Sequence, residues 1–381
     1  MSSPITVRPV ARRADLKRFV QLPRRLYKGL SGFTAPLDFE RSQLFGRKTN
    51  SFFSHGDAAY WVAFRGEEPV GRISAQIDEL HAAGGAPELG MFGAFDTIDD
   101  LEVSAALLAK ALEWLRDRGK QTVRGPFNLS ISWESGLMVD GFEEPAMLLM
   151  PWHPPYLARH LEQQGFIPAR ELQSFLIDRE TAPEQRMQSL VRSARLPDRF
   201  TQRPLSQKDG LKEFLQLAEI YNAAWNTNWG FVPLTEDDVR GMYGTMRWFT
   251  NKDSGVIIEE DGKPIAFSIS IGNVMDYVHD FDGQLSPVNI FKFVRRALRH
   301  EFDSVRNVLM GILPEYQGGA LGAALALSLL KNYVTLMDQY KANRLEFGWI
   351  EEGNKRTLDL VRYFGGVPNR RFCVYERETG L

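Results

Sequence analysis

The residues best suited to chemistry lie in one run, from Val308 to Leu330. An apolar strand is predicted to end at Pro314, and a turn then leads into a long helix whose first residues are small, namely Gly318, Gly319, Ala320, Gly322 and Ala323. Small side chains let the first backbone N–H groups of a helix approach an anion, and the helix dipole favours negative charge there. The run therefore predicts a phosphate cradle, with close helix packing through small residues as the alternative.

This cradle differs from two common phosphate motifs. No Gly-Lys-Ser/Thr follows it, as a P-loop requires. The Gly-x-Gly-x-x-Gly order of a dinucleotide site, with an acidic residue after the next strand, is also missing.

The segment Leu313–Gly322 resembles the acyl-CoA-binding motif of the GNAT acyltransferase superfamily, in which a Gln/Arg-x-x-Gly-x-Gly/Ala loop joins a strand to a helix that holds the CoA pyrophosphate. Gln317 takes the first place of that motif and Gly322 the last, with Ala320 where glycine is usual. The resemblance implies acyl-CoA as co-substrate and no metal. The residues it implies for CoA binding are Ile312, Leu313, Gln317, Gly318, Gly319, Ala320, Leu321, Gly322, Ala323 and Asn354.

The resemblance also implies direct acyl transfer from CoA to an amine. Tyr363 falls where many members carry a tyrosine near the thioester sulfur, and it is the candidate acid for the departing thiolate. Backbone N–H groups near Ile312 and Leu313 would polarise the thioester carbonyl. The base is left open between His279 with its neighbour Asp280, Glu346, and a water relay. A histidine suits a base at neutral pH.

The chain contains an internal repeat of strands and helices. Two β-rich runs around a turn, Trp61–Ser74, recur at Val256–Ser270, and Pro264 lies 195 residues after Pro69. A helix, a glycine and a strand recur at an offset of 201, between Gly165 and Gly366. Strands alternating with helices predict an α/β (α+β) fold. The resemblance implies that the two copies are tandem GNAT-like domains, each a mixed, mostly antiparallel sheet flanked by helices.

The repeat suggests domain boundaries. Residues 1–180 would form a degenerate first copy, residues 181–208 a linker or the start of the second domain, and residues 209–381 the copy with the acyl-CoA cradle. In the first copy no Gln-x-x-Gly precedes the helix, and Asp99 and Asp100 would repel a pyrophosphate.

Three stretches rich in Trp, Phe, Met and Pro suggest the acceptor site: residues 125–142, 147–156 and 221–234. Aromatic walls with a few amides suit an apolar tunnel, and ordinary interdomain packing is the alternative. The candidate substrate-binding residues are Trp133, Trp152, Tyr156, Trp225, Asn226, Trp229 and Phe231. With the tandem plan, these loops resemble the large GNAT-type proteins of Gram-negative bacteria that include bacterial ceramide synthases, which implies a long-chain amine as acceptor.

Composition narrows the remaining classes. The 381 residues carry a net charge of −2, which does not favour nonspecific binding to nucleic-acid phosphates. The six histidines show no metal-ligand spacing. The single cysteine and the early arginines predict a reducing, cytoplasmic location, with any membrane contact at the surface of the inner membrane. Three other functions stay open: acetylation of a small amine, aminoacyl transfer from tRNA as in peptidoglycan-bridge enzymes, and acyl-CoA or lipid sensing without catalysis.

Overall fold

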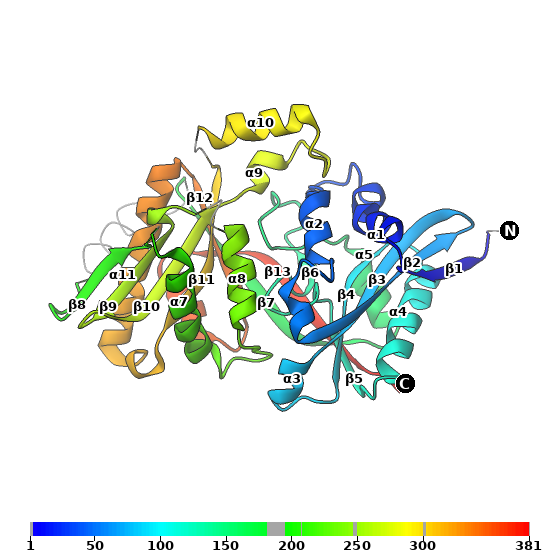
Figure 1. Ribbon diagram of the computed structural model, residues 1–381, viewed down its shortest axis with the longest axis horizontal. Coiled ribbons are helices and arrows are strands. Elements are labelled where there is room, and N and C mark those ends of the chain that lie inside the picture. Colours follow the sequence, from blue (N-terminus) through cyan, green and yellow to red (C-terminus); the bar gives the residue numbers. More distant parts are fainter. Residues whose placement is uncertain (1–2, 181–194, 207, 247–249, 300–301, 381) are drawn as a thin grey trace. The chain divides into compact units, whose positions relative to one another are not determined.

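The computed structural model describes residues 3–180, 195–206, 208–246, 250–299 and 302–380 (Figure 1). The chain divides into two compact units, and each is described by itself. Unit 1 comprises Met1–Leu172, Val278–Val294 and Arg370–Leu381, and unit 2 comprises Gln173–Tyr277 and Arg295–Asn369.

Unit 1 is built on strands in the order β1-β2-β3-β4-β5-β13, with β6 also paired to β13. Neighbouring strands are antiparallel except for the parallel pair β4 and β5. Its elements are β1 (Ile5–Pro9), α1 (Arg13–Leu26), α2 (Asp38–Leu44), η1 (Ser51–Ser54), β2 (Gly56–Arg65), β3 (Glu68–Asp78), α3 (Glu79–Ala83), β4 (Leu89–Thr97), α4 (Leu101–Arg116), β5 (Thr122–Gly125), β6 (Leu137–Asp140) and α5 (Tyr156–Gln163).

The sheet of unit 1 is covered on both faces. Alternate residues of a strand point to opposite faces, and on β2 Trp61 joins a core built around α4, while Tyr60 and Val62 join a second core that includes Phe19 of α1. This double burial explains why β2 and β4 read as nearly continuous apolar runs.

Unit 2 repeats this plan with strands in the order β12-β11-β10-β9-β8. Its strands are antiparallel except for the parallel pair β11 and β12. Its elements are β8 (Phe200–Pro204), α7 (Gly210–Trp225), α8 (Glu236–Met246), η2 (Lys252–Ser254), β9 (Gly255–Glu260), β10 (Lys263–Gly272), β11 (Ser304–Ile312), η3 (Pro314–Tyr316), α11 (Gly319–Tyr340), β12 (Arg344–Glu351) and α12 (Lys355–Tyr363). Four further elements contain a unit boundary: β7 (Ile167–Asp178), α9 (Met275–Val278), α10 (Pro287–Ala297) and β13 (Val367–Glu378).

The two units confirm the predicted repeat and fold class. In both, a strand, a long helix and a parallel strand follow one another: β4, α4 and β5 in unit 1, and β11, α11 and β12 in unit 2. The turns that lead from α5 to β7 and from α12 to β13 each contain a glycine with positive φ, Gly165 at 79° and Gly365 at 91°, so the glycine that corresponds to Gly165 is Gly365 and not the expected Gly366.

The last strand does not follow the boundaries expected from the repeat. Those boundaries place residues 209–381 together, whereas residues 370–381 belong to unit 1, where β13 pairs with β5 and β6. Of the predicted linker, residues 181–194 lie outside the described residues. The unit containing the cradle is therefore discontinuous in sequence.

By length and composition α11 could cross a membrane, with a mean hydropathy of 1.4 over its most apolar stretch. Half of that stretch is buried, and Leu325 and Leu329 lie in a core with Ile258 and Ile265. These contacts are those of a core helix in unit 2.

Candidate functional site: the N terminus of α11

The N terminus of α11 presents free backbone donors to solvent. Gly318 is the N-cap residue, with no side chain to accept hydrogen bonds, and the first intrahelical bond is from Gly322 N–H to the Gly318 carbonyl, at 3.1 Å. The N–H groups of Gly319, Ala320 and Leu321 have no acceptor among the described residues. The first turn contains no acidic residue, so the positive end of the helix dipole is not neutralised there.

The turn before the helix is held from both sides. Gln317 donates from Nε2 to the Ile312 carbonyl at 2.8 Å, which ties the turn to the end of β11. The hydroxyl of Tyr316 bonds to Glu260 on β9, and Glu260 also pairs with Arg199 at 2.7 Å. Arg199 is the basic residue next to this turn that the sequence analysis missed, because it lies more than a hundred residues earlier in the chain.

Two glycines of the cradle have room for a side chain and a third has none. A Cβ at Gly318 or Gly319 would meet nothing within 4 Å, although Gly319 has a φ of 60°. A Cβ at Gly322 would lie 2.4 Å from the Gln317 carbonyl oxygen. Gly322 therefore permits the close packing of the turn on the helix, while Gly318 and Gly319 leave open the space where an anion would bind.

Strand β11 is paired on both sides in its first half only. Its register with β12 runs from Ser304 opposite Arg344 to Asn307 opposite Phe347, whereas its pairing with β10 continues to Ile312. The second half, Val308–Ile312, thus has an open edge leading to the cradle. An extended amide chain such as pantetheine can hydrogen-bond to such an edge.

The aromatic stretch of unit 2 reaches this half of β11. The indole N–H of Trp225 donates to the Met310 carbonyl at 2.7 Å. Tyr221 stacks on Trp225 with a centroid distance of 5.6 Å and contacts the ring of Phe231 at 6.0 Å. Trp229 and Phe231 are half-buried, and Asn226 is exposed at the C-cap of α7. Four of the seven predicted acceptor residues therefore lie in the unit that carries the cradle, namely Trp225, Asn226, Trp229 and Phe231.

Tyr221 also lines a small apolar pocket between α7, α8 and the sheet. Its other walls are Phe214, Leu217, Ala218, Leu234, Val239, Met242, Phe267, Ile269 and Leu309. Its volume is about 10 Å³, near the minimum for one water molecule. An alkyl chain would have to displace side chains to enter, and the flexible Met242 is the one best able to move.

The other predicted acceptor residues belong to unit 1. Trp152 donates to the Phe142 carbonyl at 2.9 Å and contacts the ring of Tyr27 at 5.4 Å. The hydroxyl of Tyr156 donates to the Thr97 carbonyl, and Trp133 packs at the edge of the core around α1. These three side chains have structural contacts within unit 1, so their role toward a substrate stays a prediction.

The candidate catalytic residues have different surroundings. Tyr363 is 52% exposed at the C-terminal end of α12. Asn354 caps the other end, accepting from Thr357 N–H at 3.2 Å, and the two ends are about 13 Å apart at 1.5 Å per residue. The N–H of Leu313 donates to the Ile265 carbonyl at 2.9 Å, so this group is engaged in the sheet.

The two side-chain candidates for the base lie in different units. Glu346 is 1% exposed on β12, accepts from Asn369 Nδ2 at 3.2 Å, and is the register partner of Arg306, which is also buried. Glu346 is therefore buried and hydrogen-bonded within unit 2, and its role as the base stays a prediction. His279 is exposed and belongs to unit 1, as does Asp280.

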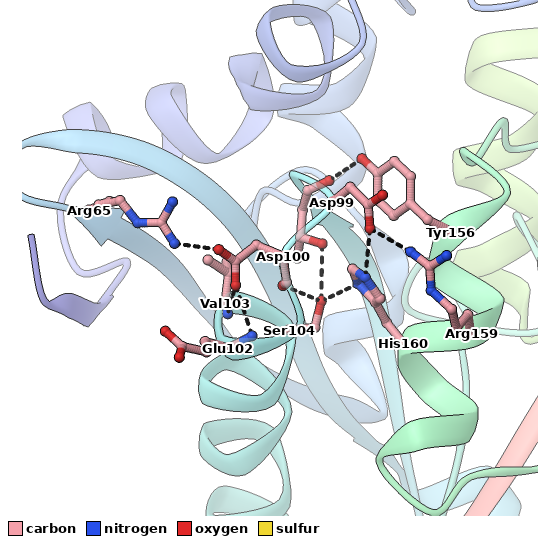
Figure 2. A network of polar contacts seen from close by, with 10 residues as sticks. Arg65, Asp99, Asp100, Glu102, Val103, Ser104, Tyr156, Arg159 and His160 are labelled. Atoms are coloured by element: carbon pink, nitrogen blue, oxygen red, sulfur yellow. Dashed lines mark hydrogen bonds and ion pairs between the residues drawn. The ribbon is translucent and has the colours of Figure 1, made fainter. Parts of the chain in front are cut away.

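In unit 1 the corresponding helix terminus is filled by the chain itself (Figure 2). Asp100 is the N-cap of α4 and accepts from the N–H groups of Glu102 at 2.9 Å and Val103 at 3.3 Å. The hydrogen bond from Arg65 lowers the pKa of Asp100, so the carboxylate stays charged. Beside it, His160 joins Ser104 at 2.7 Å and Asp99 at 3.0 Å. A bound phosphate would have to displace Asp100.

Among the described residues, no group of three or more His, Cys, Asp or Glu side chains is placed to hold a metal ion.

Known proteins match this chain over nearly its whole length. No family model matches it. It is 35% identical over 376 residues to the bacterial ceramide synthase of Caulobacter vibrioides, covering 98% of this chain and 97% of the relative. It is 33% identical over 373 residues to protein YghO of Escherichia coli, covering 98% and 95%.

Solved structures share the fold at low identity. A tandem GNAT protein from the clavulanic acid biosynthesis pathway superposes with a TM-score of 0.59 at 13% identity, covering 99% of both chains. A GCN5-related N-acetyltransferase from Sphaerobacter thermophilus gives 0.53 at 13% identity, covering 99% of this chain and 97% of that one.

Proposed function

The chain belongs to the tandem GNAT acyltransferases, in one family with the Caulobacter ceramide synthase and YghO, and on that premise we propose that it transfers a long-chain acyl group from CoA to the amine of a long-chain lipid. The observation that carries the proposal is the placement of the aromatic stretch on the open half of β11, next to the cradle, through the bond from Trp225 to Met310. The family supports an acyltransferase, and the long-chain acceptor is our proposal.

Acyl-CoA is the co-substrate that fits the cradle. Three unpaired N–H groups, open space over Gly318 and Gly319, and the absence of acidic residues in the first turn suit a pyrophosphate. We assign contact with the pyrophosphate to residues 317–323 and contact with the pantetheine to the open edge of β11 that ends at Ile312. Asn354 caps α12 and would position that helix. A CoA-dependent reaction also fits the cytoplasmic location expected from the sequence.

A long alkyl chain fits the acceptor side better than a polycation. The stretch from Tyr221 to Leu234 has three large aromatic side chains besides Tyr221 and no acidic residue. Recognition of a polyamine would call for carboxylates near the reacting nitrogen. In the described residues the walls of the neighbouring pocket are all apolar apart from the hydroxyl of Tyr221.

The reaction exchanges the C–S bond of the thioester for the C–N bond of an amide and moves one proton from nitrogen to solvent and one onto sulfur. The neutral amine nitrogen attacks the thioester carbonyl, the C–N bond of the amide forms, and the C–S bond breaks to release the CoA thiolate. We assign protonation of that thiolate to Tyr363, whose half-exposed side chain can regain a proton from solvent. The amine proton leaves through a water relay, because Glu346 is already engaged by Asn369. Holding amine and thioester together supplies the rest of the rate enhancement.

The deciding experiment is turnover with defined substrates. Free thiol release from palmitoyl-CoA is measured with sphinganine, spermidine or lysine as acceptor, and the product is identified by mass. The proposal expects thiol release and amide formation with sphinganine. Binding of palmitoyl-CoA without thiol release on any amine would indicate a sensor, and faster turnover of acetyl-CoA with a small amine would indicate an acetyltransferase.

A further inference from the structure

The helix α10 (Pro287–Ala297, yellow in Figure 1) has an apolar face exposed to solvent. None of its residues is buried. Twelve large apolar side chains are exposed among the described residues, and six of them lie within this one short segment: Leu285, Val288, Ile290, Phe291, Val294 and Leu298. Exposed apolar side chains are ordinary when scattered, but a cluster of this kind marks a binding surface.

The same segment is strongly basic. Residues 284–299 include Lys292, Arg295, Arg296 and Arg299 and contain no Asp or Glu, although the whole chain has a net charge of −2. Lys292 pairs with Asp280 at 2.9 Å, and Arg296 donates to the Tyr277 carbonyl. The side chains of Arg295 and Arg299 are exposed and form no hydrogen bond or ion pair with a described residue.

Helix geometry separates the faces of α10. At about 100° per residue, an arc of about 160° contains the apolar side chains of Ile290, Val294, Phe291 and Val288. Arg295 falls within the edge of this arc, and Leu298 and Arg299 follow in the turn directly after the helix. On another side of the helix, Asn289 donates to the carbonyls of Phe281 and Gln284, at 3.3 and 2.8 Å, which fixes the helix to the chain before it.

We propose that α10 docks the protein on an anionic phospholipid surface. The apolar arc would lie at the boundary of headgroups and acyl chains, with Arg295 and Arg299 against lipid phosphates. The helix is already formed and held by Asn289, so docking does not have to order it. A second copy of the chain fits this face less well, because two α10 helices paired about a twofold axis would bring the same cations together.

A further exposed apolar residue follows a backbone contact to the segment before α10. The N–H of Asp38, at the start of α2, donates at 2.8 Å to the carbonyl of Gly283, four residues before α10. Phe39 follows directly and is 59% exposed. A membrane surface could contact Phe39 and Leu285 together, which widens the apolar area beyond the helix itself.

Flotation of the protein with lipid vesicles tests this inference. The experiment measures binding alone, so its result does not depend on the proposed acyl transfer. We expect binding to vesicles of phosphatidylcholine mixed with phosphatidylglycerol, little binding to phosphatidylcholine alone, and weakening by salt. Phe291→Ser should reduce the partition coefficient at least about tenfold. Arg295→Gln with Arg299→Gln should reduce it by about fivefold for each arginine and remove the preference for anionic lipid.

Matched controls come from other exposed residues of the chain. Ile167 is 64% exposed on β7, close to the 69% of Phe291, and Arg13 and Lys17 are exposed cations of α1. Ile167→Ser and the pair Arg13→Gln with Lys17→Gln should leave vesicle binding unchanged. Equal losses in the controls, or no binding of the unaltered protein to anionic vesicles, would overturn the proposal. A dimer that Phe291→Ser converts to a monomer, without vesicle binding, would assign the face to a second copy instead.

Discussion

Gly318 and Asp100 are the N-cap residues of corresponding helices, α11 in unit 2 and α4 in unit 1, and they leave the two helix termini in opposite states. Asp100 supplies a carboxylate that accepts from two N–H groups of the first turn. Gly318 supplies nothing, and three N–H groups of α11 are left for a ligand. One residue type at one position thus distinguishes a closed helix terminus from an open one.

The first prediction converts the open terminus into the closed one. Gly318→Asp should keep the protein folded, because a Cβ at this position meets nothing within 4 Å and Asp is a favoured N-cap, worth about 0.5 kcal/mol or less over glycine. The new carboxylate would occupy the N–H groups and repel phosphate, so CoA affinity should fall at least about tenfold. Calorimetry with CoA and a thermal melt measure the two effects.

Gly318→Ser is the matched control, since it adds a capping oxygen without charge. It should weaken CoA binding far less than Gly318→Asp. Unchanged CoA affinity in a folded Gly318→Asp variant would remove the cradle from α11. Gly322 is a poorer probe, because any Cβ there would meet the Gln317 carbonyl oxygen at 2.4 Å and disturb the turn itself.

Much of the fold follows from local sequence patterns. The repeated strand pairs and the predicted helix beginning near Ala320 correspond to elements of the structure, because apolar periodicity and turn residues act locally. The start of α11 could be placed from its small residues alone.

Local sequence patterns do not predict contacts between segments that are distant in the chain. The pairing of β13 with β5 joins residues some 250 positions apart, and an alternating strand looks the same whichever sheet it enters. Likewise, nothing near Trp225 in sequence indicates that its indole would donate to Met310, or that Glu346 would be buried beside Asn369.

The second prediction concerns Tyr363. Tyr363→Phe keeps the ring and removes the hydroxyl, and with 52% of the residue exposed we expect little change in stability. If the hydroxyl protonates the thiolate, kcat should fall by roughly 10²–10⁴-fold while the KM for acyl-CoA changes little. Steady-state kinetics of thiol release measures both. A kcat close to that of the unaltered enzyme would assign the tyrosine to helix packing.

The third prediction is a pH dependence of stability in unit 2. Burial raises the pKa of Asp276 to about 6, although Ser304 N–H donates to it at 3.0 Å. Because the pKa is higher in the folded state, the folded protein binds the proton more tightly, and stability falls as the pH rises from about 4 to about 7. We expect a loss of about 2 kcal/mol over this range relative to Asp276→Asn.

Denaturant unfolding of both proteins across this pH range measures the difference. Asp276 contacts Ser304 at the start of β11, about 26 Å along the strand from Ile312, so acyl transfer should not follow the same titration. A constant difference between the two proteins, or one that changes in favour of the unaltered protein at high pH, would contradict the assignment.

The last prediction concerns the acceptor, through a homologous series of alkyl amines with palmitoyl-CoA held fixed. If the chain lies along Trp225, Trp229 and Phe231, each added CH₂ that is fully buried contributes about 0.8 kcal/mol, so kcat/KM should rise by up to about fourfold per carbon until the chain outgrows the site. Trp225→Ala should flatten this rise, since it removes both the indole and its bond to Met310, whereas Trp114→Ala in unit 1 should keep the slope. A flat series in the unaltered enzyme, or a preference for spermidine, would reject the long-chain acceptor. The acyltransferase assignment would be unaffected, because it rests on the family rather than on these aromatic residues.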